Sequence, residues 1–198
     1  MCEERTNIFL VRHGESTWNI EKRWQGSKNS DLTLLGMSQV EKARVTLSNI
    51  KINHAFVSPS KRAIDSIKIL LNNKAIKTIV LNDLREITLG AWEGKTHKEV
   101  EKLNPVQFYN FWNKPELFNL ENAETYERLQ NRVVSVLQNM FNQYSGSNIL
   151  VVSHGLSIKV AMAYYLKIPI SNLSKINDPL NAQIICVSKE NNFISITS

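Results

Sequence analysis

Two of the four histidines in this 198-residue chain stand in the same setting, since each follows a short apolar run and each precedes a glycine. They are His13 and His154, and His13 directly follows Arg12. A second arginine, Arg62, stands after a third apolar run. A neutral imidazole can act as a nucleophile, and an arginine can hold a phosphate with two parallel hydrogen bonds. Two histidines with two arginines therefore suggest phosphoryl transfer.

A metal site is the competing use of paired histidines. The sequence contains no His-x-x-x-His pair, and no aspartate adjoins either His-Gly step, so we expect no metal here. A lone histidine at the end of a strand is more often structural than functional. Glycine after each histidine lets the backbone approach a ligand closely, and this favours the functional interpretation.

The elements that position these residues are apolar runs that alternate with segments of helical spacing. Apolar, β-branched runs predict strands at 7–11, 54–57, 78–81, 148–152, 182–187 and 193–196. The last two form a hairpin around Glu190-Asn191-Asn192. Helical spacing predicts helices at 34–47, 61–71, 124–144 and 156–166, with short helices in the less regular segment 82–125.

Strands that alternate with helices predict an α/β fold. We expect a three-layer α/β/α sandwich with a mainly parallel mixed sheet and helices on both faces. The chain shows no internal repeat and no linker, so residues 1–198 are expected to form one domain. The residues around His13, Arg62 and His154 all stand at carboxyl ends of strands, the edge at which open α/β sheets bind ligands. They should therefore share one site.

Composition limits the partners. Lys and Arg number 24 against 18 for Asp and Glu, and the net charge of +6 suits anionic partners or a solvated lysine-rich surface. No run of five basic residues is present, which disfavours nucleic acid. No stretch reaches the roughly 18–20 apolar residues of a membrane span. Cys2 and Cys186 are too few and too distant for a disulfide framework, and the polar start of the chain does not resemble a secretory signal. We expect a cytoplasmic location.

The sequence resembles the histidine phosphatase superfamily, also called phosphoglycerate mutase-like. The clearest motif is Leu10-Val11-Arg12-His13-Gly14-Glu15-Ser16-Thr17-Trp18-Asn19. Further motifs follow in the family's order, as Gln25-Gly26, Asp31-Leu32-Thr33, Leu35-Gly36, Gln39, Ser58-Pro59-Ser60-Lys61-Arg62-Ala63, Leu84-Arg85-Glu86, Gly90-Ala91-Trp92-Glu93-Gly94 and Val152-Ser153-His154-Gly155. The ordered set spans residues 8 to 160, and it implies that residues 1–198 form a single histidine phosphatase domain.

The resemblance implies a role for each matched residue. His13 attacks phosphorus and becomes phosphohistidine, while Glu86 protonates the leaving oxygen and then activates water. The residues that would surround the phosphate are Arg12, Asn19, Gln25, Gly26, Arg62, His154 and Gly155. The nucleophile must be a neutral imidazole, so its second nitrogen should donate a hydrogen bond, for example to a backbone carbonyl. No cofactor and no metal are implied.

Several of these residues have structural alternatives. Glu86 could instead form an exposed ion pair with Arg85. An ordinary glutamic acid is ionised at pH 7, so a glutamic acid that donates a proton must be protonated by its surroundings, such as an incoming phosphate. The tryptophans that could line the pocket or pack beneath its loop are Trp18, Trp24 and Trp92. The aromatic segment 108–118 could form a lid that selects substrates.

The residues after Glu86 distinguish two branches of the family. Phosphoglycerate mutases are usually longer, carry His-Tyr-Gly after the catalytic Glu and add an Arg-Arg pair later. Here Glu86 is followed by Ile87-Thr88-Leu89-Gly90, the phosphatase pattern, and residues 95–125 contain no arginine. Phosphatase relatives often have Gly-Glu-Ser where this chain has Asn122-Ala123-Glu124-Thr125, and Thr125 could replace that Ser as an N-cap.

We therefore predict a metal-independent phosphomonoesterase of the histidine acid phosphatase type that acts on small phosphorylated metabolites. Candidate substrates are 3-phosphoglycerate, α-ribazole phosphate and sugar phosphates. The alternatives are a bisphosphoglycerate-dependent phosphoglycerate mutase and a non-catalytic module that binds phosphate or protein. The expected partners are small phosphate esters, without nucleic acid or membrane, and the expected assembly is a monomer or homodimer.

Overall fold

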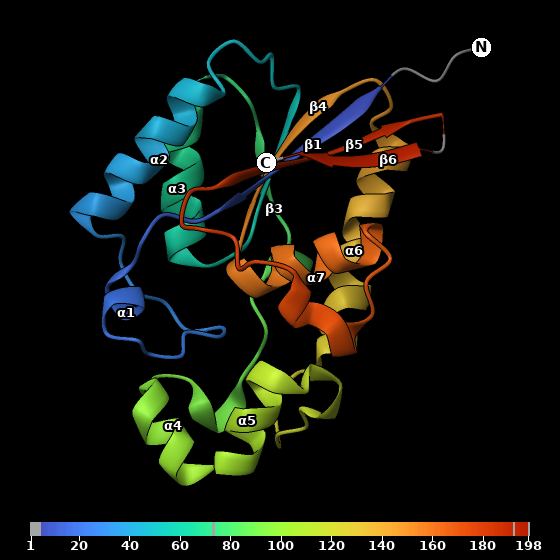
Figure 1. Cartoon of the computed structure of the whole chain (residues 1–198). Helices are drawn as coiled ribbons and strands as arrows, with labels where there is room; N and C mark the ends of the chain where they lie inside the picture. Colours follow the sequence, from blue (N-terminus) through green and yellow to red (C-terminus); the bar gives the residue numbers. More distant parts are fainter. Residues whose placement is uncertain (1–4, 73, 192, 198) are drawn as a thin grey trace.

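Six strands form one mixed sheet in the computed structural model, which describes residues 5–72, 74–191 and 193–197 (Figure 1). Their order across the sheet is β3-β2-β4-β1-β5-β6. Their bounds are Thr6–Arg12 (β1), His54–Val57 (β2), Thr78–Val80 (β3), Asn148–Ser153 (β4), Ile184–Glu190 (β5) and Phe193–Thr197 (β6). The strands β1 to β4 pair in parallel, while β5 runs antiparallel to β1 and β6 runs antiparallel to β5. The predicted sheet and its terminal hairpin are confirmed, although Asn192 of the predicted turn and Cys2 lie outside the described residues.

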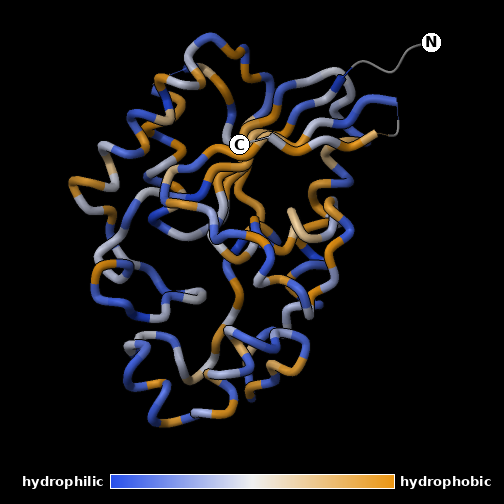
Figure 2. The backbone as a smooth tube through the Cα atoms, viewed as in Figure 1, coloured by the Kyte–Doolittle hydropathy of each residue, from blue (hydrophilic) through white to orange (hydrophobic). Residues whose placement is uncertain are grey.

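Helices cover both faces of the sheet (Figure 1). Their bounds are Leu34–Thr46 (α2), Lys61–Leu71 (α3), Tyr126–Gln143 (α6) and Gly155–Tyr165 (α7). Successive residues of a strand point to opposite faces, so Phe9 and Val11 of β1 pack with α2 and α3. Ile8 and Leu10 pack with α6 and α7. The strands are therefore apolar on both faces and form the hydrophobic centre seen in Figure 2, which confirms the three-layer α/β/α sandwich. None of the described helices is long and apolar enough to cross a membrane.

Short helices fill the segment between β3 and α6, as predicted. They are Asn82–Leu84 (η1), Gly90–Trp92 (η2), His97–Leu103 (α4), Pro105–Asn113 (α5) and Pro115–Leu117 (η3). A capping box between Thr96 and Glu99 starts α4, and Pro105 stands in the first turn of α5, where its missing N–H costs nothing. We call residues 90–118 the helical cap. In Figure 1 its helices α4 and α5 lie below the sheet, beyond the carboxyl ends of the parallel strands.

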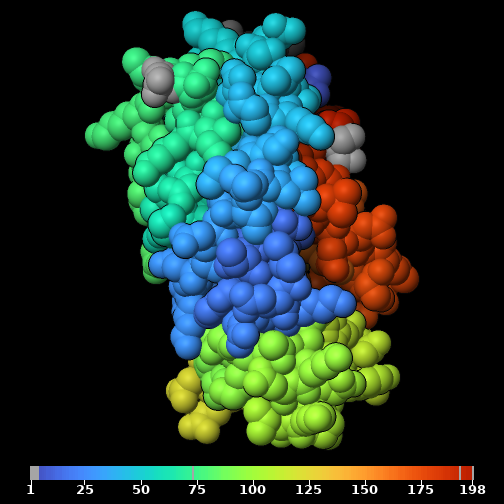
Figure 3. Space-filling model, turned by 90° about the vertical axis from the view of Figure 1, so that its left-hand side faces the viewer, coloured from blue at the N-terminus to red at the C-terminus, as the bar shows by residue number. Residues whose placement is uncertain are grey.

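The loop after β1 closes against the helical cap. It contains a short helix, α1 (Thr17–Ile20), which the sequence pattern did not predict; a second unpredicted element, η4 (Ile170–Lys175), follows α7. The backbone N–H of Trp24 donates to the carbonyl of Lys95 at 2.9 Å, and the N–H of Gly94 donates back to Trp24 at 2.8 Å. Figure 3 shows this blue loop between α2 above and the green cap below. The loop and the cap therefore form one wall over the edge of the sheet.

Two glycines let the start of this loop lie directly on α2. A Cβ atom on Gly36 would lie 2.0 Å from the carbonyl oxygen of Glu15, and one on Gly14 would lie 2.4 Å from the carbonyl oxygen of Gly36. Thr33, the N-cap of α2, accepts from the N–H of Gly36 at 2.9 Å and donates to the Glu15 carboxylate at 2.8 Å. The backbone next to His13 is thereby fixed to a helix.

We predict that Gly36→Ala destabilises the protein, although alanine normally favours a helix over glycine by up to about 1 kcal/mol. The added methyl group meets the backbone of Glu15, and overpacking of this kind costs about 1–3 kcal/mol. Urea unfolding measures the change, and Ser38→Ala, at an exposed position of the same helix, is the matched control and should be neutral or stabilising. Equal stabilities of the two variants would contradict the close contact.

Candidate active site

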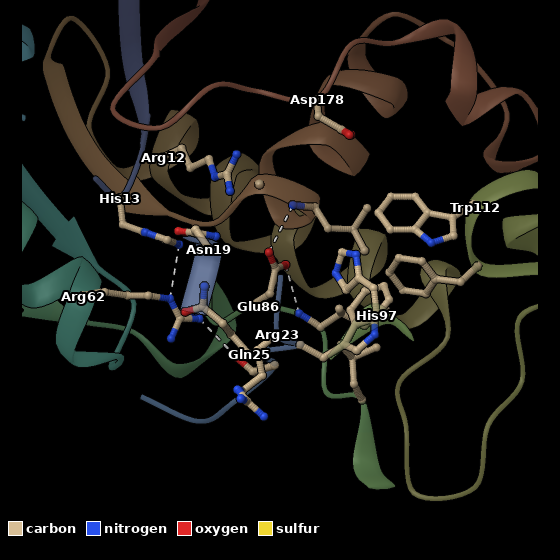
Figure 4. Close-up of a pocket in the computed structure, with 17 residues that line it drawn as sticks. Arg12, His13, Asn19, Arg23, Gln25, Arg62, Glu86, His97, Trp112 and Asp178 are labelled. Carbon is tan, nitrogen blue, oxygen red and sulfur yellow. Dashed lines mark hydrogen bonds between the residues drawn. The ribbon is translucent and has the colours of Figure 1, made fainter. Parts of the chain in front are cut away.

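A cavity of about 210 Å³ opens at the carboxyl ends of the parallel strands (Figure 4). The sheet edge and the turns after it contribute Arg12, His13, Arg62, Glu86, Ile87, Gly155 and Leu156. The loop after β1 contributes Asn19, Arg23, Trp24, Gln25 and Gly26, and the remaining lining residues are Leu89, His97, Phe111, Trp112 and Asp178. Of the predicted catalytic and substrate-binding residues, only His154 is outside this lining. The three polar groups that follow β1, β2 and β4 therefore do meet.

Arg62 is buried, with 1% of its surface exposed, and its guanidinium is surrounded by acceptors. Nη1 donates to the carbonyl of Lys28 at 2.7 Å, and Nη2 donates to the carbonyl of Gly26 at 3.2 Å. The other two acceptors are ring nitrogens, Nε2 of His13 at 3.2 Å from Nε and Nδ1 of His154 at 3.1 Å from Nη2. Burial lowers the pKa of Arg62 to about 10, so the guanidinium stays charged at pH 7.

The contacts of His13 define which ring nitrogen carries the proton. Nδ1 lies 2.7 Å from the carbonyl oxygen of Gly14, which can only accept, so Nδ1 is the donor. Nε2 then holds a lone pair, and it points toward Arg62 (Figure 4). Burial, followed by the charges of Arg62 and Arg12, lowers the pKa of His13 well below its ordinary value. The residue is a neutral imidazole at pH 7, with the carbonyl contact that the sequence analysis expected.

His154 lies behind Arg62 instead of in the cavity wall. Its Nδ1 accepts from Arg62, so Nε2 carries the proton and donates to the hydroxyl of Ser58 at 2.7 Å. Burial and the charge of Arg62 lower its pKa well below the ordinary value, and it is fully buried. In this structure His154 orients Arg62, because the lone pair of His154 Nδ1 is one of the acceptors that the buried guanidinium needs.

Arg12 has a free donor inside the site. Nη1 donates to the carbonyl of Pro179 at 2.7 Å, but Nε is buried without a hydrogen-bond partner among the described residues. A buried donor left unpaired costs about 1–3 kcal/mol, and an anion would satisfy it. A Cβ atom at Gly155 would lie 3.3 Å from this Nε, so glycine leaves room beside it. Gly155 also begins α7, and helix N-termini favour anions.

Asn19 and Gln25 are held by the same serine. The amide oxygen of Asn19 accepts from the backbone N–H of Ser16 at 3.0 Å, which leaves its NH₂ group as the donor for a ligand. The side chain of Gln25 donates to Ser16 at 2.9 Å and accepts from Ser30 at 2.9 Å, so it braces the loop.

Gly26 stands at φ +48°, and a Cβ there would overlap the carboxylate of Glu93. That carboxylate accepts from the N–H groups of Ser27 at 3.1 Å and Leu89 at 3.0 Å. Any other residue at position 26 would be strained, so glycine is needed to place this backbone, whose carbonyl accepts from Arg62, in the cavity wall.

Glu86 lies at the N-terminus of α7. Its carboxylate accepts from the N–H of Leu156 at 3.2 Å and from the N–H of Ser157 at 3.1 Å. The alternative partner from the sequence analysis, Arg85, lies 3.6 Å from Glu124 instead. The structure therefore brings Glu86 into the cavity with His13, with its carboxylate fixed by a helix end.

The far side of the cavity is aromatic. The ring of Trp24 lies 4.4 Å from His97, 4.7 Å from Phe111 and 5.6 Å from Trp112, measured between centroids. Burial and the nearby charge of Lys22 lower the pKa of His97, so this ring is uncharged at pH 7. Segment 108–118 thus supplies two wall residues.

The three tryptophans of the sequence analysis have different positions. Trp24 lines the cavity, Trp92 is buried in the hydrophobic core, and Trp18 lies beneath the guanidinium of Arg23. Arg23 and Asp178 also line the cavity, although no sequence motif marked them as site residues. Arg23 directly precedes the Trp24-Gln25-Gly26 run and could have been found by that adjacency, whereas Asp178 lies in a loop without a motif.

The arrangement suits a phosphate ester. Two charged guanidiniums and the neutral imidazole of His13 line one end of the cavity, while Glu86 lies between that end and the aromatic wall (Figure 4). A dianion would be drawn to the arginines, and the lone pair of His13 Nε2 is the nearest nucleophile. Among the described residues, no group of three or more His, Cys, Asp or Glu side chains is placed to hold a metal ion.

Comparisons with known proteins agree with this description. Residues 8–197 match the family model of the histidine phosphatase superfamily (branch 1). Phosphoglycerate mutase-like protein 4 of Arabidopsis thaliana is 31% identical over 151 residues, which are 75% of this chain and 66% of that protein. The putative phosphoserine phosphatase 2 of Hydrogenobacter thermophilus is 28% identical over 86% of this chain and 83% of its own length. The solved structure of YhfR from Bacillus stearothermophilus has a TM-score of 0.94 at 29% identity, covering 96% of this chain and 95% of that one.

We predict opposite tautomers for the two buried histidines. Nitrogen-15 NMR of the imidazole rings should show the proton on Nδ1 of His13 and on Nε2 of His154, because the carbonyl of Gly14 can only accept and the guanidinium of Arg62 can only donate. Both rings should stay neutral to well below pH 6.5, since burial and the arginines lower both pKa values. A proton on Nε2 of His13, or protonation of either ring near pH 6.5, would contradict the geometry.

Proposed function

Because the chain belongs to the histidine phosphatase superfamily, we propose that it hydrolyses small phosphate monoesters through a phosphohistidine formed on His13. The observation that carries the proposal is the lone pair of His13 Nε2, which lies in a cavity between two guanidiniums. The relatives include phosphatases and mutase-like proteins, and hydrolysis is the simpler of the two reactions.

Phosphate binding would begin at the unpaired donor of Arg12. Arg12, Asn19 and Gly155 all line the cavity, and the donors that they would offer to a phosphate are Nε, the amide NH₂ and the backbone N–H. The phosphate would also draw Arg62 Nε away from His13, because a charged acceptor makes the stronger hydrogen bond. That exchange would free the Nε2 lone pair at the moment when the phosphorus atom is in place.

Two transfers would complete the reaction. In the first, the N–P bond to His13 Nε2 forms while the P–O bond to the leaving group breaks, and Glu86 donates a proton to the departing oxygen. In the second, Glu86 takes a proton from water, the water oxygen attacks phosphorus, and the N–P bond breaks to release inorganic phosphate. The two arginines would stabilise the charge on the phosphoryl oxygens in both transfers.

The size of the cavity and its largely uncharged wall support a substrate whose leaving group is small and carries no second phosphate. Sites for drug-sized ligands have volumes of about 300–1,000 Å³, and this cavity of about 210 Å³ is smaller. The wall beyond Glu86 consists mostly of rings, and Arg23 already pairs with Glu21 at 2.8 Å. A mutase must hold a second phosphate there, and this wall offers no free cluster of arginines among the described residues.

The proposal extends to the setting of the enzyme. Residues 1–198 would act as one histidine phosphatase domain, without a cofactor, in the cytoplasm. Its partners would be small phosphate esters, and it would work as a monomer or homodimer.

The test measures phosphate release from p-nitrophenyl phosphate and a panel of metabolites, including 3-phosphoglycerate and phosphoserine, in the presence of EDTA. We expect hydrolysis by the wild type and a loss on the order of 10⁴-fold or more in His13→Ala, because the variant lacks the nucleophile. The control for correct folding is an unchanged circular dichroism spectrum.

A second arm repeats the panel with 2,3-bisphosphoglycerate. Conversion of 3- to 2-phosphoglycerate that requires the bisphosphate, with no net hydrolysis, would replace the proposal with a mutase. Hydrolysis that persists in His13→Ala would overturn the assignment of the nucleophile. Folded protein without either activity would leave a binding module as the better description.

A further inference from the structure

Arg132, in the second turn of α6, holds the backbone of the segment that presents Glu86. Its Nε and Nη2 donate to the two carboxylate oxygens of Glu124, each at 2.7 Å. Nη1 donates to the carbonyls of Asp83 and Arg85, each at 2.8 Å, and Nη2 also donates to the carbonyl of Glu86 at 3.1 Å. All five N–H donors of this guanidinium are therefore used, and three of them bind backbone carbonyls within residues 83–86.

That segment has little regular structure of its own. Residues 85–88 belong to no helix or strand, so their carbonyls need partners from elsewhere. Serine hydroxyls supplement Arg132, because Ser153 donates to the carbonyl of Leu84 at 2.8 Å and Ser157 donates to that of Arg85 at 2.9 Å. Side-chain donors take the place of a hydrogen-bonded ladder here, and Arg132 supplies most of them.

The pair of Arg132 and Glu124 is well shielded from water. The exposed fractions of the two side chains are 11% and 9%. Glu124 also fixes the far end of the same segment, since its N–H donates to the carbonyl of Thr88 at 2.8 Å. A lysine at 132 would be a point charge and could not reproduce the planar fork that reaches one carboxylate and three carbonyls.

We propose that Arg132, paired with Glu124, is a positioning residue for proton transfer by Glu86, and this inference rests on the proposed function. Arg132 does not line the cavity and acts through the backbone of Glu86. The N–H groups of Leu156 and Ser157 hold the carboxylate from the other side. A misplacement of about 1 Å can cost about 100-fold in rate. A shifted Glu86 would fail to protonate the leaving oxygen, while the attack by His13 would remain possible.

Leaving-group dependence separates these two effects. A p-nitrophenolate leaves without a proton, whereas an alkoxide must receive one as the P–O bond breaks. We expect Arg132→Lys to lower kcat/KM about 10- to 100-fold for an alkyl phosphate such as glycerol 2-phosphate, but less than about 3-fold for p-nitrophenyl phosphate. The ratio kcat/KM reports only the steps through formation of the phosphohistidine, so a change in its hydrolysis does not interfere.

Four further variants, the single variant Glu86→Gln among them, make the result decisive. Arg128→Lys, at an exposed position one turn earlier in α6, is the matched control and should leave both values unchanged. Glu124→Gln removes the charge of the partner with little change of shape and should show the same selective loss. It keeps the test possible if Arg132→Lys does not fold. The double variant Glu86→Gln/Arg132→Lys should be no slower on the alkyl phosphate than Glu86→Gln, because Arg132 acts through Glu86.

The outcomes also separate the inference from the proposed function. One outcome is a selective loss in Glu86→Gln, but equal losses on both esters in Arg132→Lys and Glu124→Gln. This would overturn the positioning role of Arg132 and keep Glu86 as the acid. An additive loss in the double variant would do the same. No selective loss in Glu86→Gln would remove Glu86 as the acid, and the proposed proton transfer would fail with it.

Discussion

A buried guanidinium at the carboxyl edge of the sheet is the constraint on which the rest of the site depends. Removing a charge from water costs several kcal/mol unless its donors find acceptors. The acceptors of Arg62 come from the end of β1, the end of β4 and the loop 26–28, so one side chain joins three parts of the chain. The same bonds fix the tautomers of His13 and His154. Burial, followed by the charge of Arg62, therefore keeps the proposed nucleophile His13 neutral.

The two ends of the cavity are built in different ways. The end with His13 and the two arginines, where we propose that phosphate binds, stands on buried parallel strands, whose positions are fixed by packing against helices on both faces. Glu86 stands on an irregular segment, which is held by the end of α7 and by side chains from α6 and β4. It lies between His13 and the rings of His97 and Trp112 (Figure 4), where the bond to the leaving group would break.

Much of this arrangement could be predicted from the sequence. The apolar runs before Arg12 and Ser153 identified two central strands, since buried parallel strands are apolar throughout. Thr125 was correctly expected to be an N-cap, and its side chain accepts from the N–H of Arg128. The position of His154 behind Arg62 could not be predicted, because it depends on how one guanidinium divides its donors. The role of Arg132 is invisible in the sequence for a related reason: its partners are backbone carbonyls about 46–49 residues away, which no side-chain pattern records.

If the phosphoryl group passes through His13, it can be trapped there, and this trapping is the most direct measurement. The enzyme would be mixed with p-nitrophenyl phosphate, quenched in alkali, where phosphohistidine is stable, and digested for mass spectrometry. We expect one phosphate per chain, and we expect it on Nε2 of His13, because Nδ1 donates to the carbonyl of Gly14. The label should be lost on acid treatment. Turnover with no label on His13, or with a label on another residue, would contradict the proposed mechanism.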